Sequence, residues 1–122
     1  MTQPWTCTMN YRRGAVVLVV FPNSDLRSAK KRPALLVQDH TVVTDQQQTL
    51  VACITSKLHR KGETRVRVNA NSSEGRQTGL LMDSVIVADN LATVPHWALK
   101  KQLGSYPCME RVDQALRKTL GL

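Results

Sequence analysis

Two short basic segments hold the side chains with the clearest potential for chemistry. The first runs from Lys30 to Pro33, directly before an aliphatic stretch, and the second runs from Thr55 to Lys61, directly after another. Arg32 and Thr55 stand closest to these stretches, so rigid strands would fix their positions. Together, a guanidinium fork and a hydroxyl could bind a phosphodiester and stabilise the negative charge that develops on it.

This chemistry would be sufficient to cleave RNA, because the substrate supplies its own nucleophile. The ribose 2′-hydroxyl can attack the adjacent phosphate, so the enzyme has to orient it and stabilise the added charge. Arg32 would act mainly as this electrostatic stabiliser, since a guanidinium stays protonated at any ordinary pH. The residues alone leave another interpretation open, in which Arg32 pairs with a carboxylate and Thr55 only ends a strand.

Other side chains near this pair could assist. His59 is a candidate for moving protons, although His40 and His96 also lie in predicted loops or at a helix start, and a lone histidine is usually an ordinary surface residue. Ser56 adds a second hydroxyl beside Thr55. Further cations that could contact RNA phosphates are Lys30, Lys31, Lys57, Arg60 and Lys61.

Several other enzyme classes are excluded because their signatures are absent. The sequence has no glycine-rich phosphate loop, no GxSxG or HExxH motif and no acidic cluster that could hold Mg²⁺. Its three cysteines, Cys7, Cys53 and Cys108, have neither CxxC spacing nor histidines at metal-ligand spacing. We therefore expect no metal and no cofactor, and we expect the thiols to be free.

The strong positive charge of the chain limits the classes of binding partner that we expect. The 122 residues include 17 Lys and Arg against 9 Asp and Glu, which gives a formal net charge of +8. Such a chain favours RNA, DNA or an acidic polypeptide, whereas no cationic amphipathic helix indicates a membrane surface. The sequence has neither a signal peptide nor an apolar segment long enough to span a bilayer, which predicts a cytoplasmic protein of one domain.

The elements that must hold the site are mostly strands. Runs of β-branched residues between turn residues predict strands at 15–21, 33–37, 49–55, 64–70 and 80–88. The basic residues before Pro33 are predicted to form a loop, and 71–79 a turn-rich connection. A short helix is expected within 93–104, and the apolar spacing predicts an amphipathic helix over 109–120.

The order of these elements indicates the fold class. Many short strands come first and a helix comes last, which predicts a mainly β member of the α+β class rather than alternating βαβ units. We expect a small barrel with the C-terminal helix packed on it, preceded by an N-terminal arm over residues 1–11.

Five blocks of the sequence, taken together, resemble the MazF/PemK family of toxins. They occur in the family's order and cover almost all of the chain beyond the arm. The blocks are RRG at 12–14, KRPALLV at 31–37, CITS at 53–56, GLLMDSVIVADNLATV at 79–94 and MERVDQALRKTLGL at 109–122.

This resemblance implies a fold, a reaction and partners. It implies an SH3-like antiparallel β-barrel with a C-terminal helix, a symmetric homodimer, and an acidic antitoxin of the MazE/PemI kind. The implied reaction is metal-independent cleavage of single-stranded RNA at short motifs, leaving a 2′,3′-cyclic phosphate and a 5′-hydroxyl. The family's catalytic arginine and threonine fall on Arg32 and Thr55, and a family acidic residue corresponds to Asp25 in the preceding loop.

Two other functions are compatible with the same fold. One is a non-catalytic topoisomerase poison like the CcdB toxins, which would use a tryptophan-bearing C-terminal tip, whereas this chain ends in Thr119 to Leu122. The other is an RNA-binding relative with impaired catalysis, for which the hint is Ala15 at a position where the family usually has an acidic residue. The C-terminal residues and the presence of Arg32 and Thr55 favour the nuclease over the topoisomerase poison.

Overall fold

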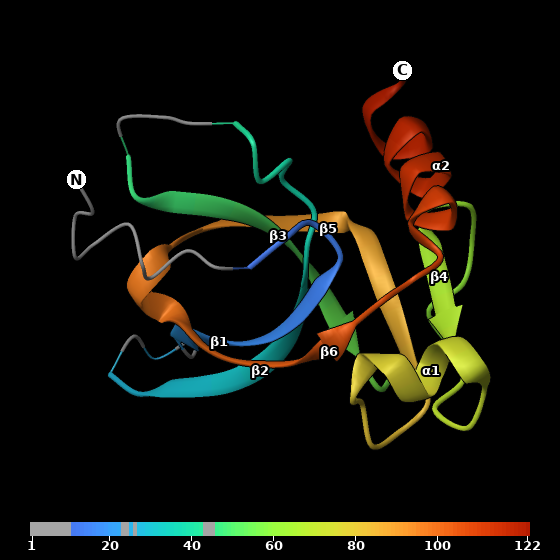
Figure 1. Ribbon diagram of the computed structural model, residues 1–122, viewed down its shortest axis with the longest axis horizontal. Coiled ribbons are helices and arrows are strands. Elements are labelled where there is room, and N and C mark those ends of the chain that lie inside the picture. The colour runs from blue at the N-terminus through green and yellow to red at the C-terminus, as the bar shows by residue number, and fades with distance from the viewer. Residues whose placement is uncertain (1–10, 23–24, 26, 43–45) are drawn as a thin grey trace.

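One antiparallel sheet of six strands forms most of the molecule (Figure 1). The computed structural model describes residues 11–22, 25, 27–42 and 46–122, so the predicted arm lies almost wholly outside the described residues. The spatial order is β4-β5-β3-β2-β1-β6. The strands are β1 (Ala15–Pro22), β2 (Ala29–Leu36), β3 (Gln48–Thr55), β4 (Arg65–Val68), β5 (Ser84–Pro95) and β6 (Leu99–Ser105).

Three helical segments accompany the sheet: α1 (Ser73–Thr78), the 3-10 turn η2 (His96–Ala98) and α2 (Met109–Leu120). The mainly β architecture with a C-terminal helix is therefore confirmed. Within the described residues, the hydrogen-bonded order ends at β4 on one side and β6 on the other, so closure into the predicted barrel is not confirmed. No helix in the described part of the chain is long and apolar enough to cross a membrane.

The sheet buries side chains on both of its faces, which explains why β1 is aliphatic without interruption. Val16 belongs to the cluster beneath α2, whereas Val17 and Val19 belong to the cluster on the opposite face. A strand that is buried on both faces needs apolar residues at every position. On the first face, Val112 and Ala115 of α2 complete the core.

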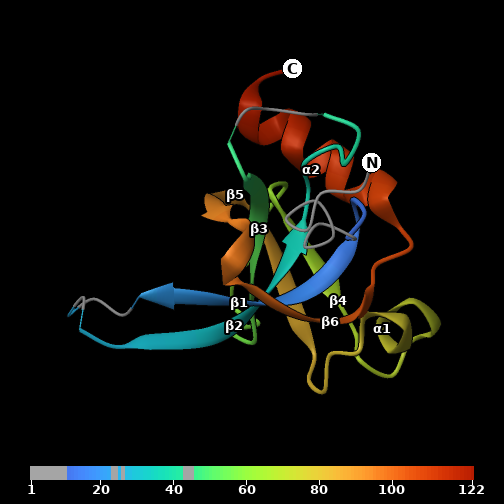
Figure 2. The same cartoon turned by 60° about the vertical axis from the view of Figure 1, so that its left-hand side comes forward.

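Strand β2 begins at Ala29 and not at Pro33, so the predicted basic loop is wrong. Residues 29–35 pair with β1 in an extended hairpin, which projects from the body in Figure 2. Strand β3 pairs with β2 only from Ala34 to Leu36. The projecting part of β2 is thus an edge on the β3 side, where Pro33 and charged side chains are tolerated.

Two further predictions of local structure are also corrected. The short helix expected within 93–104 is only the three-residue turn η2, and β6 follows it because residues 99–105 pair with β1. Conversely, part of the predicted turn-rich connection is the helix α1. Ser72 caps this helix by accepting a hydrogen bond from the Gly75 amide at 3.0 Å.

Helix α1 and strand β6 approach so closely that glycine is required on both. Gly79 ends α1 with a φ of 73°, and a Cβ atom there would collide with the Leu103 carbonyl. A Cβ atom on Gly104 would collide with the Gln77 carbonyl. These contacts fix the segment that follows α1 against the sheet.

The predicted C-terminal helix is confirmed, and an arginine connects it to the start of β1. Arg13 donates from Nε to the Val37 carbonyl at 2.8 Å and from Nη2 to Asp113 of α2 at 2.7 Å. The ion pair therefore joins β1, the end of β2 and the helix.

Candidate functional site

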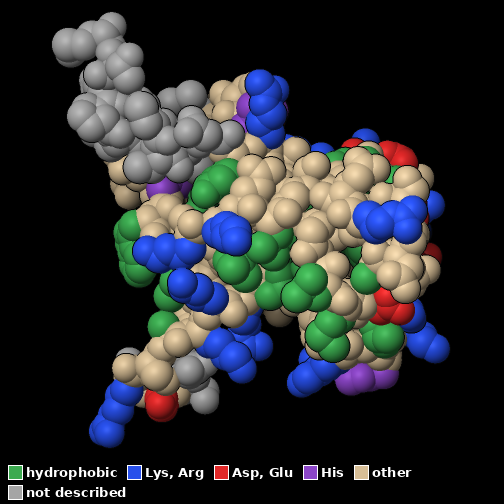
Figure 3. Space-filling view, turned by 60° about the horizontal axis from the view of Figure 1, so that its bottom comes forward, with side chains coloured by type: hydrophobic (Ala, Val, Ile, Leu, Met, Phe, Trp, Pro, Cys, Tyr) green, Lys and Arg blue, Asp and Glu red, His purple; other side chains and the backbone are tan. Residues whose placement is uncertain are grey.

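A large groove lies between the β1–β2 hairpin and the body of the molecule. It has a volume of about 1140 Å³ and is lined by residues of the hairpin, the end of β3 and the segment before β5. Figure 3 shows this indentation with Lys and Arg side chains on both of its sides. It is the cavity that Arg32 and Thr55 share.

Arg32 and Thr55 both line the groove, and the strand register explains why. Strands β2 and β3 are antiparallel, with Ala34 opposite Cys53. Continuing this register by two residues on each strand places Arg32 opposite Thr55 on the same face, although the two strands separate there. Two residues 23 positions apart in the sequence thus line the same groove.

The hydroxyl of Thr55 has a defined orientation. Its oxygen accepts a hydrogen bond from the Lys57 amide at 3.2 Å as the chain turns away from β3. A threonine oxygen that accepts from the backbone still has its own proton to donate. Thr55 can therefore act as a donor to a bound anion while the turn holds it in place.

Cys53 provides a second observation on the position of Arg32. This half-buried thiol also lines the groove, and burial raises its pKa, while the positive charge of Arg32 opposes the rise. The guanidinium is thus near enough to Cys53 for its charge to act on the thiol. Both Cys53 and Cys108 are free, as expected from their spacing.

Four of the five predicted RNA-binding cations line the groove with Arg32: Lys30, Lys31, Lys57 and Arg60. Lys61 lies outside it, and its carbonyl accepts a hydrogen bond from Arg65 at 3.0 Å. Among the described residues, no carboxylate lies within ion-pair distance of any of the cations in the groove. The five ion pairs found in the described part of the chain are elsewhere: Arg13–Asp113, Arg65–Asp89, Arg67–Asp83, Arg111–Glu74 and Lys118–Glu63.

The three predicted supporting residues are not brought together. Ser56 lines the groove beside Thr55, whereas His59 is exposed in the following turn and outside the groove lining. Asp25 lies near the hairpin tip, where its carboxylate accepts hydrogen bonds from the Arg27 and Ser28 amides. These backbone hydrogen bonds lower the pKa of Asp25, and the residue stabilises the turn.

The apolar wall of the groove was not predicted from the sequence. Leu80, Leu81 and Met82 follow α1 and face the hairpin, and Leu81 is 96% exposed. The sequence analysis placed these residues in a strand, but β5 begins only at Ser84. The signal that could have located them is Gly79, which ends α1 and turns the chain outward.

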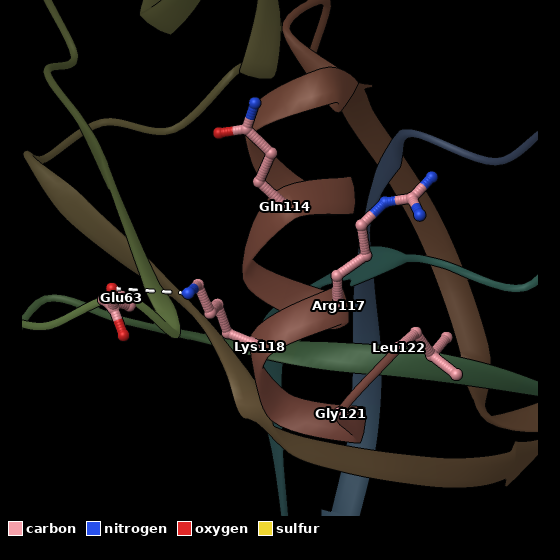
Figure 4. Close-up of a pocket in the computed structure, with 6 residues that line it drawn as sticks. All are labelled: Glu63, Gln114, Arg117, Lys118, Gly121 and Leu122. Atoms are coloured by element: carbon pink, nitrogen blue, oxygen red, sulfur yellow. Dashed lines mark ion pairs between the residues drawn. The ribbon is translucent and has the colours of Figure 1, made fainter.

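A second hollow lies at the end of α2 and contains none of the predicted site residues. It has a volume of about 630 Å³ and is lined by Glu63, Gln114, Arg117, Lys118, Gly121 and Leu122 (Figure 4). Its cation Lys118 is already paired with Glu63 at 3.7 Å. Elsewhere too, the described residues contain no group of three or more His, Cys, Asp or Glu side chains that could hold a metal ion.

The family of the chain follows from its sequence match over nearly the whole length. Residues 12–120 match the family model described as the PemK-like, MazF-like toxin of type II toxin–antitoxin systems. The chain belongs to this PemK/MazF toxin family. No match is found among curated proteins.

Solved structures of PemK/MazF toxins share the fold. The Mycobacterium tuberculosis toxin MazF-mt6 is 25% identical, with a TM-score of 0.70 over 88% of this chain and 97% of that one. A mycobacterial endoribonuclease in complex with its cognate antitoxin is 24% identical, with a TM-score of 0.71 over 92% and 96%. The toxin of a MazE–MazF complex from Deinococcus radiodurans is 19% identical, with a TM-score of 0.68 over 92% and 96%.

Proposed function

We propose that this PemK/MazF toxin is an endoribonuclease that cleaves single-stranded RNA in the groove beside the β1–β2 hairpin. The observation that carries the proposal is that Arg32 and Thr55 line the same groove, whose cations have no carboxylate partners among the described residues. Similar folds that are named endoribonucleases support the same reaction class. The family match favours this function over a CcdB-like topoisomerase poison.

The proposed reaction uses the nucleophile of the substrate. The ribose 2′-oxygen forms a bond to the adjacent phosphorus, the bond from phosphorus to the 5′-oxygen breaks, and the products are a 2′,3′-cyclic phosphate and a 5′-hydroxyl. The 2′-hydroxyl loses a proton and the departing 5′-oxygen gains one. No metal is required by this scheme, because the cation that stabilises the extra charge is a side chain.

Arg32 and Thr55 would have different roles at the scissile phosphate. The guanidinium of Arg32 binds two phosphate oxygens and stabilises the charge that develops in the transition state. Thr55 donates its proton to a non-bridging oxygen, since its own oxygen is already held by the Lys57 amide. Ser56 follows Thr55 directly in the sequence and lines the same groove, so it adds a second hydroxyl.

Proton transfer is assigned to solvent or to His59. His59 lies in the turn after β3, beyond the groove lining, so that a water would have to connect it to the substrate. An unchanged pH–rate profile in His59→Ala would remove the histidine from the mechanism. Asp25, whose carboxylate is bound to backbone amides, is proposed to act through the hairpin turn rather than on the substrate.

Regulation would follow from the same charges. We propose that an acidic antitoxin of the MazE/PemI kind occupies the groove and competes with RNA, because cations without an internal partner attract either polyanion. The toxin would act as a homodimer in the cytoplasm, where mRNA is available. An acidic antitoxin peptide should therefore displace RNA, and simultaneous binding of both would contradict the competition.

The decisive experiment is cleavage of a long RNA by the purified protein in EDTA, followed by mapping of the ends. We expect cuts at a short motif with cyclic-phosphate ends, and a loss of at least about a hundredfold in rate for Arg32→Ala. Arg67→Ala is the matched control, because Arg67 is exposed but lies on β4 beside Asp83. Equal activity in the Arg32 and Arg67 variants would refute the proposed mechanism.

A further inference from the structure

Beside the groove, the surface of the sheet carries an exposed tryptophan. Trp97 lies in η2, between β5 and β6, and is 68% exposed. The ammonium of Lys100 lies 5.7 Å from the centre of its ring. A large aromatic ring that remains in solvent under a cation is a feature of surfaces that bind single-stranded nucleic acid.

The strand pairing connects this ring to the groove. Leu99, two residues after Trp97, pairs with Val19 of β1, and Val19 pairs with Arg32 of β2. Neighbouring strands are about 4.8 Å apart, so the backbone at Leu99 is about 10 Å from the backbone at Arg32. Figure 1 shows η2 next to the hairpin end of β1, against which it packs.

A second row of paired residues continues the groove toward β6. Leu18 and Pro33 both line the groove and lie opposite each other, and Leu18 also lies opposite Lys101. Residues directly opposite in antiparallel strands share a face. Consecutive residues of a strand point to opposite faces, so Lys101 lies past β1 on the Leu18 face and not on the Val19 face of Leu99 and Arg32.

An irregularity in β6 accounts for the position of Lys100. Lys101 pairs with Leu18 and Leu99 pairs with Val19, so Lys100 is an extra residue between two consecutive pairs. A bulge of this kind changes the direction of a side chain, and here it accompanies the contact with Trp97. Within the described chain, neither Lys100 nor Lys101 has a carboxylate within ion-pair distance.

We propose that Trp97 and Lys100 form a stacking subsite for an unpaired ribonucleotide that lies outside the groove, on the part of the RNA strand that crosses β1. The base would stack on the indole, and Lys100 would bind a neighbouring phosphate. This inference rests on the proposed endoribonuclease function. It adds a binding position that recognises the strand by stacking and charge, independently of base identity.

The test measures how affinity depends on the length of the RNA. Oligonucleotides of about 4 and about 12 nucleotides with 2′-O-methyl groups bind without being cleaved, because they lack the attacking hydroxyl. In a Trp5→Phe background, Trp97 is the only tryptophan, so its emission reports on the subsite. We expect the longer oligonucleotide to quench this emission and to bind more tightly than the shorter one.

Substitutions at the subsite should then remove the higher affinity of the longer oligonucleotide, which is called the length advantage below. Trp97→Ala should raise the Kd for the longer oligonucleotide about tenfold and bring it toward that for the shorter one, whereas Trp97→Phe should retain most of the advantage. Lys100→Ala should reduce the advantage, but the matched Lys118→Ala, at the far end of α2, should not. Because Trp97 is exposed, these variants should retain the melting temperature of the parent.

The two proposals can fail separately. If Arg32→Ala abolishes cleavage but Trp97→Ala leaves the length dependence intact, the subsite is overturned and the endoribonuclease stands. If Trp97→Ala removes the length dependence but Arg32→Ala cleaves normally, the subsite stands and the catalytic proposal fails. Quenching by poly-glutamate and not by RNA would assign the surface to an acidic protein and overturn the inference.

Discussion

The two sides of the molecule use their basic residues in opposite ways. On the helix side, formed by β4, α1, α2 and the first half of β5, Arg65, Arg67 and Arg111 pair with nearby carboxylates, whereas Arg76 and Arg117 do not. On the groove side, formed by the β1–β2 hairpin and the ends of β3 and β6, no lysine or arginine in the described chain has such a pair. Cations that lack an internal partner are available to a ligand, which distinguishes a binding surface from a merely basic one.

The contrast also explains how a strongly basic chain can fold. Nine acidic residues cannot neutralise seventeen basic ones, and five of the nine are used in ion pairs on the helix side. These pairs support the packing of α2 and β4 against the sheet, although each exposed pair contributes little by itself. Five of the cations that have no such pair among the described residues line the groove: Lys30, Lys31, Arg32, Lys57 and Arg60.

The largest effect is expected when the hydroxyl of Thr55, on the groove side, is removed. Thr55→Val keeps the shape of the side chain but removes the donor, so the cleavage rate should fall about a hundredfold while RNA binding changes little. Single-turnover cleavage and oligonucleotide affinity, measured on the same protein, separate the two effects. The matched Thr119→Val on α2 should cleave normally, and equal losses in both variants would remove Thr55 from the mechanism.

A leucine substitution on each side tests where stability resides. Leu35 is fully buried beneath α2, whereas Leu81 on the groove wall is 96% exposed. Leu35→Ala should lower the free energy of unfolding by about 3 kcal/mol, whereas Leu81→Ala should change it by less than about 0.5 kcal/mol. Urea denaturation of both variants provides the measurement. A large loss in Leu81→Ala would mean that the apolar wall is part of the folding core.

Two pairs of charge substitutions sharpen the electrostatic contrast. Lys30→Gln with Lys31→Gln should weaken RNA binding and reduce the slope of log K against log salt concentration by about 1.4, since each phosphate contact on a single strand contributes about 0.7. Arg67→Gln with Lys118→Gln removes the same charge from the helix side. If both double variants had the same salt dependence, binding would depend on net charge alone.

The smallest expected effect concerns pH. Burial lowers the pKa of His96 below its ordinary value of 6.5, and a hydrogen bond with the Gln48 backbone partly opposes this. As the pH falls below 6.5, the His96 imidazole becomes protonated in the unfolded chain before it does in the folded one. The stability contributed by neutral His96 is therefore present above pH 6.5 and is lost as the pH falls toward the lowered pKa. Urea midpoints measured through this range should show a shallower acid slope in His96→Gln than in the parent. An identical slope would contradict this assignment.

The sequence predicted the elements whose pattern is set by burial. Strand β1 and helix α2 have apolar residues that follow the periodicity of their element, because each packs on a core. The hairpin half of β2 lacks such a pattern, since it is exposed, and its charges therefore resembled a loop. The segment that forms β6 has apolar residues at helical spacing, but pairing with β1 decides its conformation.

The site was predictable in part for the same reason. Arg32 and Thr55 could be selected because each adjoins a buried stretch, and the pairing of β2 with β3 brings those stretches together. The apolar wall could not, since the position of Leu81 depends on the end of α1, a helix with only Gly75 and Thr78 buried. His59 and Asp25 have suitable chemistry, but their distance from the groove lining depends on turns that sequence periodicity does not describe.

Gly104 has a consequence for how the family could diversify. It lies behind the apolar wall, where its missing side chain lets β6 touch the backbone at the end of α1. A Cβ atom there would meet the Gln77 carbonyl, so a larger residue would have to displace the end of α1 and, with it, the apolar segment that follows. The shape of the groove can thus change between family members through a residue that does not line it.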